Sequence, residues 1–363
     1  MKKTFKIIAA LLAFALVFGF VASCDTADDA ATDTGSSEST GSAGGESSSG
    51  SERPAPVGKD IYNDPIRIAQ ISISTAGPVN RLYRMALEEQ LVRYPNVTLD
   101  IRDAEYNPTR QITLIQEAIT QGYDAILLEA MDPFALNDAV AEAEDAGIPV
   151  ITLNAAQPLT LHSLHMAGAD HATGWTSGEL MDEMTRGQSN RTAIVLDCPD
   201  AFKPAALMGT GFQDYIATTD ITELQAIGIE NWSTDNARVA MADMLTRYGP
   251  GEITMVYCAN DDIAGGAMLA IEAAGRTGDI LVWGFQVQPT GFEGIQNGQL
   301  AGSMFSDTYV QYSSALYFAM YFIASGINSR TAGYTETPMV EQPMLPVTID
   351  NVETMMAVSR WYS

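Results

Sequence analysis

Short apolar runs alternate with longer amphipathic stretches from about residue 64 onward, and the apolar runs have the length and β-branched content of buried strands. In the first half, this pattern predicts strands at 66–74, 97–104, 125–130, 148–154 and 164–169. Helical spacing of apolar residues predicts helices at 79–94, 109–122 and 134–147. Strands that alternate with helices pair in parallel through right-handed crossovers, so the first half is predicted to be a doubly wound α/β unit.

The second half repeats the same alternation of strands and helices. Strands are predicted at 192–198, 224–230, 253–259, 280–285 and 301–306, with helices at about 205–219, 235–248, 262–275 and 289–298. In open sheets of this kind, residues just past the carboxyl ends of the strands line the binding crevice. Two similar α/β units in one chain therefore predict a ligand between them.

The N-terminus has the pattern of an export signal. Lys2, Lys3 and Lys6 precede the apolar run "IIAALLAFALVFGFVAS", which is short for a membrane span and ends in small residues before Cys24. Residues 1–23 are thus predicted to be a signal peptide. "VASC" resembles a bacterial lipobox, which predicts lipidation of Cys24; an ordinary cleavage site or a buried core thiol are the alternatives.

Residues 24–60 are predicted to be a lipidated cysteine followed by a disordered tether. The stretch is rich in Ser, Gly, Thr, Asp and Glu, and has no aromatic or large aliphatic residue before Val57. Such a composition buries too little apolar area to order a chain. The tether would allow the folded domain to extend away from a lipid anchor that lies in a membrane.

Charge excludes one class of partner. The formal net charge is −26, and removing residues 1–23 takes away three lysines and no acidic residue, so 16 basic against 45 acidic residues leave −29. A surface of this charge repels nucleic acid.

Five motifs occur in the order and spacing of one known family. They are "AILLEAMDP", "IPVITLN", "GTGF" before a helix, "ITMVYCANDDIAGGAMLAIEAAG", and "ILVWGFQ" followed by "GFEGIQNGQLAGSM". Together they resemble the ribose-type solute-binding proteins of sugar ABC transporters, which have the type I periplasmic binding fold, over roughly residues 64–330. Lac-repressor-type regulators share this fold, but they carry an N-terminal helix-turn-helix where this chain has a predicted export signal.

The resemblance implies two doubly wound parallel-sheet lobes, joined by a three-strand hinge, that close on a small polar molecule. It places the chain crossings near 168–173, 306–309 and 333–338. The N-terminal lobe would then comprise 61–170 and 308–335, and the C-terminal lobe 171–307 and 336–363. The apolar stretch 307–326 is either a membrane span or a buried helix, and Asp307 and Gln311 favour the buried helix.

Asn260 matches the family's ligand-binding asparagine by position. Sugars present hydroxyls that both donate and accept, together with apolar C–H faces, so sugar pockets combine amides and carboxylates with aromatic rings. Asp261 either joins the site or caps the helix that follows it, and Asp262 is predicted to be a solvated charge in the first helical turn.

Further candidates lie at strand ends and in neighbouring loops, partly by resemblance to the family. These ligand-binding candidates are Ser74, Thr75, Glu129, Asn154, Phe202, Trp232 and Gln286. Trp232 either covers the ligand or packs on the surface, and Phe202 is either a cleft aromatic or a packed loop residue. Glu129 either accepts hydrogen bonds from hydroxyls or pairs with an amine, or is merely solvated at the rim.

Departures from the family pattern bear on the ligand. Ala155 and Ala206 stand where ribose-type proteins have arginines, and Gln286 stands where they usually have Asp. Without those guanidinium groups the pocket lacks strong, forked donors, so we do not expect it to be tuned to ribose.

Enzyme and metal chemistry have little support in the sequence. We find no G-x-S-x-G, no G-x-x-x-x-G-K-[ST] and no dinucleotide-binding glycine motif, and no cofactor is expected. His162 and His165, three apart on a strand, should point to opposite faces, and His171 should lie near a helix start, so no metal site is expected. Cys198 and Cys258 end neighbouring strands and are either bridged or two separate thiols.

These patterns predict an extracytoplasmic, membrane-anchored lipoprotein, on the outer face of the cytoplasmic membrane or in a periplasm. It would bind a sugar-like molecule as a monomer by hinge closure and deliver it to an ABC permease on a separate polypeptide. Two rival hypotheses remain. The same receptor could report to a chemotaxis or sensor-kinase system, or the cleft could belong to an extracytoplasmic hydrolase.

Overall fold

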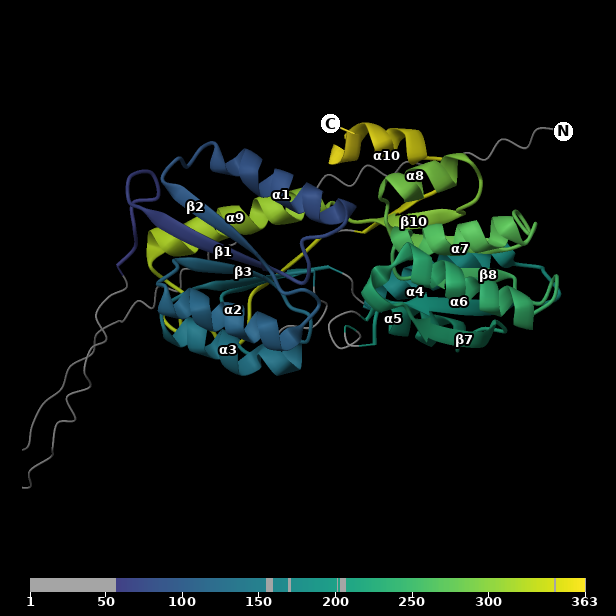
Figure 1. The fold of residues 1–363 in the computed structure, drawn as a ribbon, viewed down its shortest axis with the longest axis horizontal. Coiled ribbons are helices and arrows are strands. Elements are labelled where there is room, and N and C mark those ends of the chain that lie inside the picture. The colour runs from purple at the N-terminus through teal and green to yellow at the C-terminus, as the bar shows by residue number, and fades with distance from the viewer. Residues whose placement is uncertain are drawn as a thin grey trace, which may run out of the picture. The chain divides into compact units, whose positions relative to one another are not determined.

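Six strands build each of two sheets in the computed structural model, and helices pack against both sheets (Figure 1). The structure describes residues 57–154, 159–168, 171–200, 202, 207–342 and 344–362. The predicted signal peptide, Cys24 and most of the predicted tether lie outside these residues, as do Ala155 and Ala206. Everything described below belongs to one unit, Pro54–Ser363.

The first sheet has the strand order β11-β5-β4-β3-β1-β2, and all its neighbouring pairs are parallel. Its strands are β1 (Ile66–Ser72), β2 (Val97–Asp103), β3 (Ala125–Glu129), β4 (Val150–Leu153), β5 (Leu164–Ala167) and β11 (Met339–Glu341). Its helices are α1 (Pro78–Leu91), α2 (Pro108–Thr120), α3 (Pro133–Asp145) and α9 (Thr308–Ser325). Side chains alternate along β1, so Ile68 packs beneath α1 and α9 whereas Ile71 packs beneath α2 and α3 (Figure 1). We call this sheet and its helices the first lobe.

The second sheet has the order β12-β10-β9-β8-β6-β7, with one antiparallel pair, β10 with β12. Its strands are β6 (Thr192–Asp197), β7 (Thr222–Gly228), β8 (Met255–Cys258), β9 (Leu281–Gln286), β10 (Gly302–Phe305) and β12 (Leu345–Val347). Its helices are α4 (His171–Thr185), α5 (Met208–Ile216), α6 (Thr234–Arg247), α7 (Asp261–Ala273), α8 (Pro289–Gln296) and α10 (Val352–Val358), with 3-10 turns at Glu230–Trp232 and Arg360–Tyr362. Helix α4 packs on α5 and α6 packs on α7. We call this half the second lobe.

Helices α2 and α3 begin at the sheet edge where the strands before them end. Asn107 caps α2 by accepting from the backbone N–H of Arg110, and Asp132 caps α3 by accepting from two backbone N–H groups. In each case proline follows the cap, where its missing N–H leaves no hydrogen bond unmade. These caps fix the positions of the strand ends that precede them.

The last passage between the sheets lies later than the sequence predicts. Strand β11 pairs with β5 of the first sheet, and β12 pairs with β10 of the second. The chain therefore crosses between residues 341 and 345 rather than near 333–338, and residues 336–341 belong with the first lobe. Both strands are only three residues long, which is too short to show the alternation of apolar and polar positions that identifies a strand in a sequence.

The apolar stretch that follows the second lobe's last parallel strand forms a buried helix. Helix α9 packs on α1 and against β3 and β4, and its buried residues include Tyr312, Leu316 and Met320. Across the described ranges, no helix is both long enough and apolar enough to cross a membrane. The buried-helix alternative for 307–326 is therefore the one observed.

Glu144, near the end of α3, ties several segments of the first lobe together. The side chain is 1% exposed. One carboxylate oxygen accepts from the backbone N–H groups of Val150 and Ser163, both at 2.8 Å. The other accepts from the backbone N–H (3.0 Å) and hydroxyl (2.7 Å) of Ser329 and from the Ser163 hydroxyl (3.1 Å). Helix α3, β4 and the segment after α9 thus converge on one buried carboxylate.

We expect Glu144→Gln to lower the free energy of unfolding by roughly 2–4 kcal/mol, because an NH2 group then faces buried N–H donors that lose their acceptor. Urea unfolding followed by circular dichroism measures the change. Glu142→Gln, which makes the same charge change at an exposed position of the same helix, is the control. A loss no larger than that of the control would contradict the role assigned to Glu144.

Asp261 holds the strand ends of the second lobe in the same manner. Its carboxylate is 0% exposed and accepts from the backbone N–H of Gln288 (2.7 Å) and the hydroxyl of Ser303 (2.8 Å). Gly284 and Gly291 leave it room, since a Cβ at either would collide with a carboxylate oxygen. Burial raises the pKa of Asp261 from 3.8 to about 7, against the lowering effect of these hydrogen bonds.

The raised pKa of Asp261 gives the second lobe a pH-dependent stability. Because the folded state prefers the protonated acid, this contribution is fully present below about pH 4 and is lost as the pH rises toward 7. His162, whose pKa burial lowers to about 4, acts in the opposite direction, so the comparison must be made against a variant. Asn is a suitable mimic of the protonated acid, because its oxygen accepts from Gln288 while its NH2 donates to Ser303.

We expect wild-type protein to lose up to about 3 kcal/mol of unfolding free energy relative to Asp261→Asn between about pH 5 and pH 8. Urea titrations of both proteins at the two pH values give the difference. Parallel pH profiles for the two proteins would show that Asp261 does not titrate in this range.

Candidate ligand-binding site

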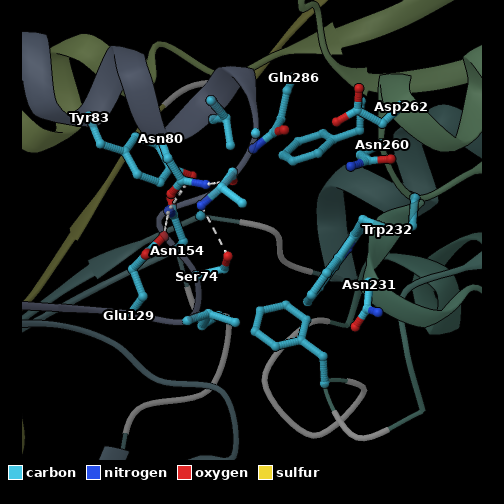
Figure 2. Close-up of a pocket in the computed structure, with 18 of the residues that line it drawn as sticks. Ser74, Asn80, Tyr83, Glu129, Asn154, Asn231, Trp232, Asn260, Asp262 and Gln286 are labelled. Atoms are coloured by element: carbon cyan, nitrogen blue, oxygen red, sulfur yellow. Dashed lines mark hydrogen bonds between the residues drawn. The ribbon is translucent and has the colours of Figure 1, made fainter. Parts of the chain in front are cut away.

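A cavity of about 370 Å³ lies between the two lobes, at the carboxyl ends of their strands (Figure 2). Polar side chains enter it from both sides. The first lobe contributes Ser74, Asn80, Tyr83, Glu129 and Asn154, and the second lobe contributes Asn231, Asn260, Asp262 and Gln286. The aromatic lining consists of Tyr83, Tyr106, Phe202, Trp232 and Phe285. Seven of the eight residues that the sequence predicts as ligand contacts, all except Thr75, therefore line this cavity.

Glu129 and Asn154 form the first-lobe wall, at the ends of β3 and β4. The Asn154 Nδ2 group donates to the Tyr83 hydroxyl and to Glu129 Oε1, both at 3.0 Å. Both amide hydrogens are thereby used, which directs the acceptor capacity of Asn154 to a ligand. Glu129 is 5% exposed, so the alternative of a solvated carboxylate at the rim is wrong. Burial raises its pKa.

Two stacked tyrosines support Glu129 from the helices behind it. The rings of Tyr83 on α1 and Tyr312 on α9 lie 4.0 Å apart at an angle of 11°. Burial raises the pKa of both hydroxyls, and the nearby Glu129 carboxylate raises both further. The two phenols therefore remain neutral hydrogen-bonding groups beside the carboxylate.

Trp232 is the centre of an aromatic group on the second-lobe wall. Its ring meets that of Phe202 edge-on, with centroids 4.9 Å apart, and lies 5.9 Å from that of Tyr106. Tyr106 follows β2 in the first lobe, so this contact spans the cavity. Phe202 is 7% exposed and both packs in the second-lobe core and lines the cavity. Trp232 likewise lines the cavity rather than packing on the outer surface.

Asn260, not Asp261, caps helix α7. Its Oδ1 accepts from the backbone N–H of Ile263 at 2.9 Å, which leaves the Nδ2 group as the part that a ligand can use. Asp261 points into the core, so neither of the two alternatives for it, a site contact or a helix cap, is observed. Asp262 lines the cavity and burial raises its pKa, so it is not the solvated first-turn charge that the sequence suggests.

Several cavity residues have left-handed backbone conformations. Positive φ angles occur at Tyr106 (55°), Asn154 (61°), Asn231 (58°), Trp232 (49°) and Gln286 (86°). Such conformations are uncommon outside glycine and cost free energy unless the surroundings impose them. Their gathering around one cavity supports its assignment as the functional site. At Gln286, Oε1 is fixed by the Nε2 group of Gln288 at 3.0 Å.

Thr75 is the one predicted contact that lies outside the cavity. Its backbone N–H and hydroxyl both donate to Asp103 Oδ2, at 3.1 and 2.6 Å, so the side chain is committed to the loop after β1. The sequence reading missed Asn80, Tyr83, Tyr106 and Asn231, which lie on a helix or in loops rather than directly at strand ends. Asn80 and Tyr83, three apart in the first turns of α1, could have been found from their shared helical face.

The histidines and cysteines form no metal or disulfide site in the structure. His162 and His165 both contact the Thr152 hydroxyl, at 2.8 and 2.7 Å, so the expected opposite orientation is wrong because His162 precedes β5 and does not follow strand alternation. His171 contacts Asp214 at 2.8 Å. No group of three metal-ligating side chains occurs among the described residues. Cys198 and Cys258 are buried and are not joined, and burial raises the pKa of the Cys258 thiol.

Sequence comparison identifies the family. A model described as periplasmic binding protein domain matches residues 71–326. A xylitol-binding protein of Mycolicibacterium smegmatis is 26% identical over 259 residues, which cover 71% of this chain and 73% of that protein. The ribose import binding protein of Escherichia coli is 26% identical over 206 residues, 57% of this chain and 68% of that protein. These relatives are binding proteins, and the chain is accordingly a binding protein rather than an enzyme.

Solved structures show the same fold. A solute binding protein from Bacillus halodurans with bound myo-inositol has a TM-score of 0.69 and 22% identity, with 82% of this chain and 99% of that chain covered. A galactofuranose binding protein has a TM-score of 0.71 and 17% identity, with 81% and 98% covered. The match of the family model over most of the chain and the shared two-lobed architecture lead to one conclusion: this chain belongs to the periplasmic binding protein domain family.

Proposed function

We propose that the chain captures a sugar or sugar-like polyol in the cavity between its lobes and delivers it to an ABC importer. The observation that carries the proposal is the composition of the cavity wall, where amides and carboxylates of both lobes face one space beside aromatic rings (Figure 2). Amides and carboxylates match hydroxyls, and rings cover C–H faces. The xylitol- and ribose-binding relatives support the same class of ligand.

The residues that we propose as ligand contacts come from both lobes. They are Ser74, Glu129, Asn154, Phe202, Trp232, Asn260 and Gln286, to which the cavity adds Asn80, Tyr83, Tyr106, Asn231 and Asp262. A ligand that touches both walls favours the arrangement in which the lobes are close, and this differential binding drives hinge closure. Micromolar affinity corresponds to about 8 kcal/mol, which several hydrogen bonds and one or two ring contacts can supply.

The N-terminal segment bears on where capture takes place. We propose that residues 1–23 direct export, that Cys24 carries a lipid, and that the polar stretch after it tethers a monomeric receptor outside the cytoplasmic membrane. The proposal is supported by the lipobox-like "VASC" and by the family to which the chain belongs.

A thermal-shift screen of pentoses, hexoses, polyols, cyclitols and amino sugars tests the proposed function, with calorimetry on each positive compound. A ligand present at a hundredfold excess over its Kd stabilises the folded state by about 2.7 kcal/mol, which raises the melting temperature measurably. We expect at least one polyol to do so. If no compound of these classes changes the melting temperature at millimolar concentration, the proposed function is wrong.

Trp232→Ala should weaken binding of a polyol found in that screen by about tenfold or more, because the ligand loses the ring that covers its C–H face. Isothermal titration calorimetry measures the Kd. Phe134→Ala, which removes an aromatic ring that is 68% exposed and outside the cavity, is the control. Equal affinity in the Trp232 variant and the control would remove Trp232 from the site.

Asn260 requires a variant that separates its two roles. Serine keeps a capping oxygen but lacks the amide, so Asn260→Ser should keep the melting temperature near that of wild type and weaken binding by about tenfold. Asn260→Ala should lose both the helix cap and the amide contact, and the missing cap should lower the free energy of unfolding by about 1 kcal/mol. Unchanged affinity in the serine variant would show that the Nδ2 group does not contact the ligand.

A further inference from the structure

The charged groups of the cavity wall are all of one sign. Glu129 of the first lobe and Asp262 of the second both line the cavity. No lysine, arginine or histidine lines it within the part of the chain that the structure describes. A ligand with a carboxylate or phosphate would therefore enter a space that holds two acidic groups and no countercharge, which is unfavourable at low dielectric.

Glu129 is the more deeply buried of the two carboxylates, and its neighbours are neutral. Asn154 donates to it, Tyr83 of α1 and Tyr312 of α9 lie beside it, and Ser72 of β1 contributes a further hydrogen bond. It forms no ion pair with any described residue. Burying a carboxylate without a countercharge is costly, and the raised pKa of Glu129 reflects this cost. The structure thus supplies hydrogen bonds to Glu129 but leaves its charge uncompensated on the side that faces the cavity.

The opposite wall is suited to a cation as well. Asp262 adds a second negative charge, and burial raises its pKa too. The rings of Trp232, Tyr106 and Phe202 surround the same space, and aromatic faces attract ammonium groups. The formal net charge of −26 further favours the approach of a cationic ligand.

We propose that the ligand is an amine-bearing polyol, an amino sugar or an aminocyclitol, whose protonated amine pairs with Glu129. This inference rests on the proposed function and specifies its ligand class. The ammonium group supplies three donors and the countercharge that Glu129 lacks, while the hydroxyls of the same molecule use the amides of Asn154, Asn260 and Gln286. Neutral polyols would satisfy the amides but leave the carboxylate charge uncompensated.

Matched pairs of compounds test the proposal by calorimetry at about pH 6, where the amines are protonated. The pairs are D-glucosamine with D-glucose, D-galactosamine with D-galactose, and an amino-deoxy inositol with myo-inositol. In at least one pair we expect the amine to bind about tenfold or more tightly than its hydroxyl counterpart, as for a buried charge-assisted hydrogen bond. If the hydroxyl member binds as well or better in all three pairs, the amine proposal is overturned and the proposed function stands. If none of the six compounds and no polyol of the broader screen binds, both fall.

Variants then assign the effect to Glu129. We expect Glu129→Gln to reduce the amine-to-hydroxyl affinity ratio to about threefold or less, since the pairing charge is gone. Glu142→Gln makes the same charge change on the exposed face of α3 and should preserve the ratio. Lys203→Gln should also preserve it; Lys203 lies outside the described residues, and this variant tests whether its ammonium competes for the carboxylate. A ratio that persists in Glu129→Gln overturns the assignment.

Proton release provides a second measurement that does not depend on a variant that folds. A bound ammonium lowers the pKa of Glu129, so over the pH range in which Glu129 titrates, amine binding to wild-type protein should release more protons than binding of the hydroxyl member. Titrations at several pH values cover this range. Calorimetry in two buffers of different ionisation enthalpy measures the number released. Among the described residues, the other titratable groups that line the cavity or lie beside Glu129 are Tyr83, Tyr106, Tyr312 and Asp262. Equal proton release for both members of a pair that shows an amine preference would contradict pairing with Glu129.

Discussion

Parallel pairing in both sheets is the constraint on which the rest of the molecule depends. Because the strands of successive βαβ units end at the same sheet edge, Glu129 at the end of β3 and Asn154 just after β4 become neighbours although they are 25 positions apart in the chain. The same rule brings Asn260 and Gln286 together in the second lobe. Each lobe alone carries half of a binding wall, so a ligand that uses both halves also couples them.

Three buried carboxylates illustrate how this architecture separates stability from binding. Glu144 is satisfied by five donors from its own lobe, and Asp261 by donors from the second lobe, in a space kept open by glycines. Glu129 is held in position by Asn154 but faces the cavity. The first two therefore stabilise the lobes, whereas the third faces the cavity and has no ion-pair partner among the described residues.

Backbone strain is concentrated where the lobes face each other. Asn154 and Gln286 leave their strands in left-handed conformations, and Asn231 and Trp232 do so in the short turn after β7. These conformations redirect side chains from the sheet edge into the cavity. Both lobes have large buried cores. The stability that these cores provide is large compared with the free-energy cost of the left-handed conformations.

The sequence by itself determined the alternation of strands and helices, and with it the sheet edges at which polar side chains gather. The apolar runs that contain β4, β8 and β9 carry strong patterns, so the ends of these strands, and hence Asn154, Asn260 and Gln286, were predicted correctly as cavity residues. Strands β11 and β12 were missed because three residues are too few to show an alternating pattern. The third crossing was consequently misplaced.

Only the tertiary structure decided which of the adjacent polar residues face the cavity. Asn260, Asp261 and Asp262 are consecutive, yet their side chains differ in position. Asn260 caps a helix and lines the cavity, Asp261 is buried in the core, and Asp262 lines the cavity as an acidic group. Thr75 donates hydrogen bonds to Asp103 instead of lining the cavity, whereas Asn80 and Tyr83 reach the cavity from helix α1. Side-chain direction depends on backbone angles and on packing between segments distant in the chain, which local sequence does not encode. The same is true of the lack of a countercharge for Glu129 among the described residues, since a countercharge can come from any part of the fold.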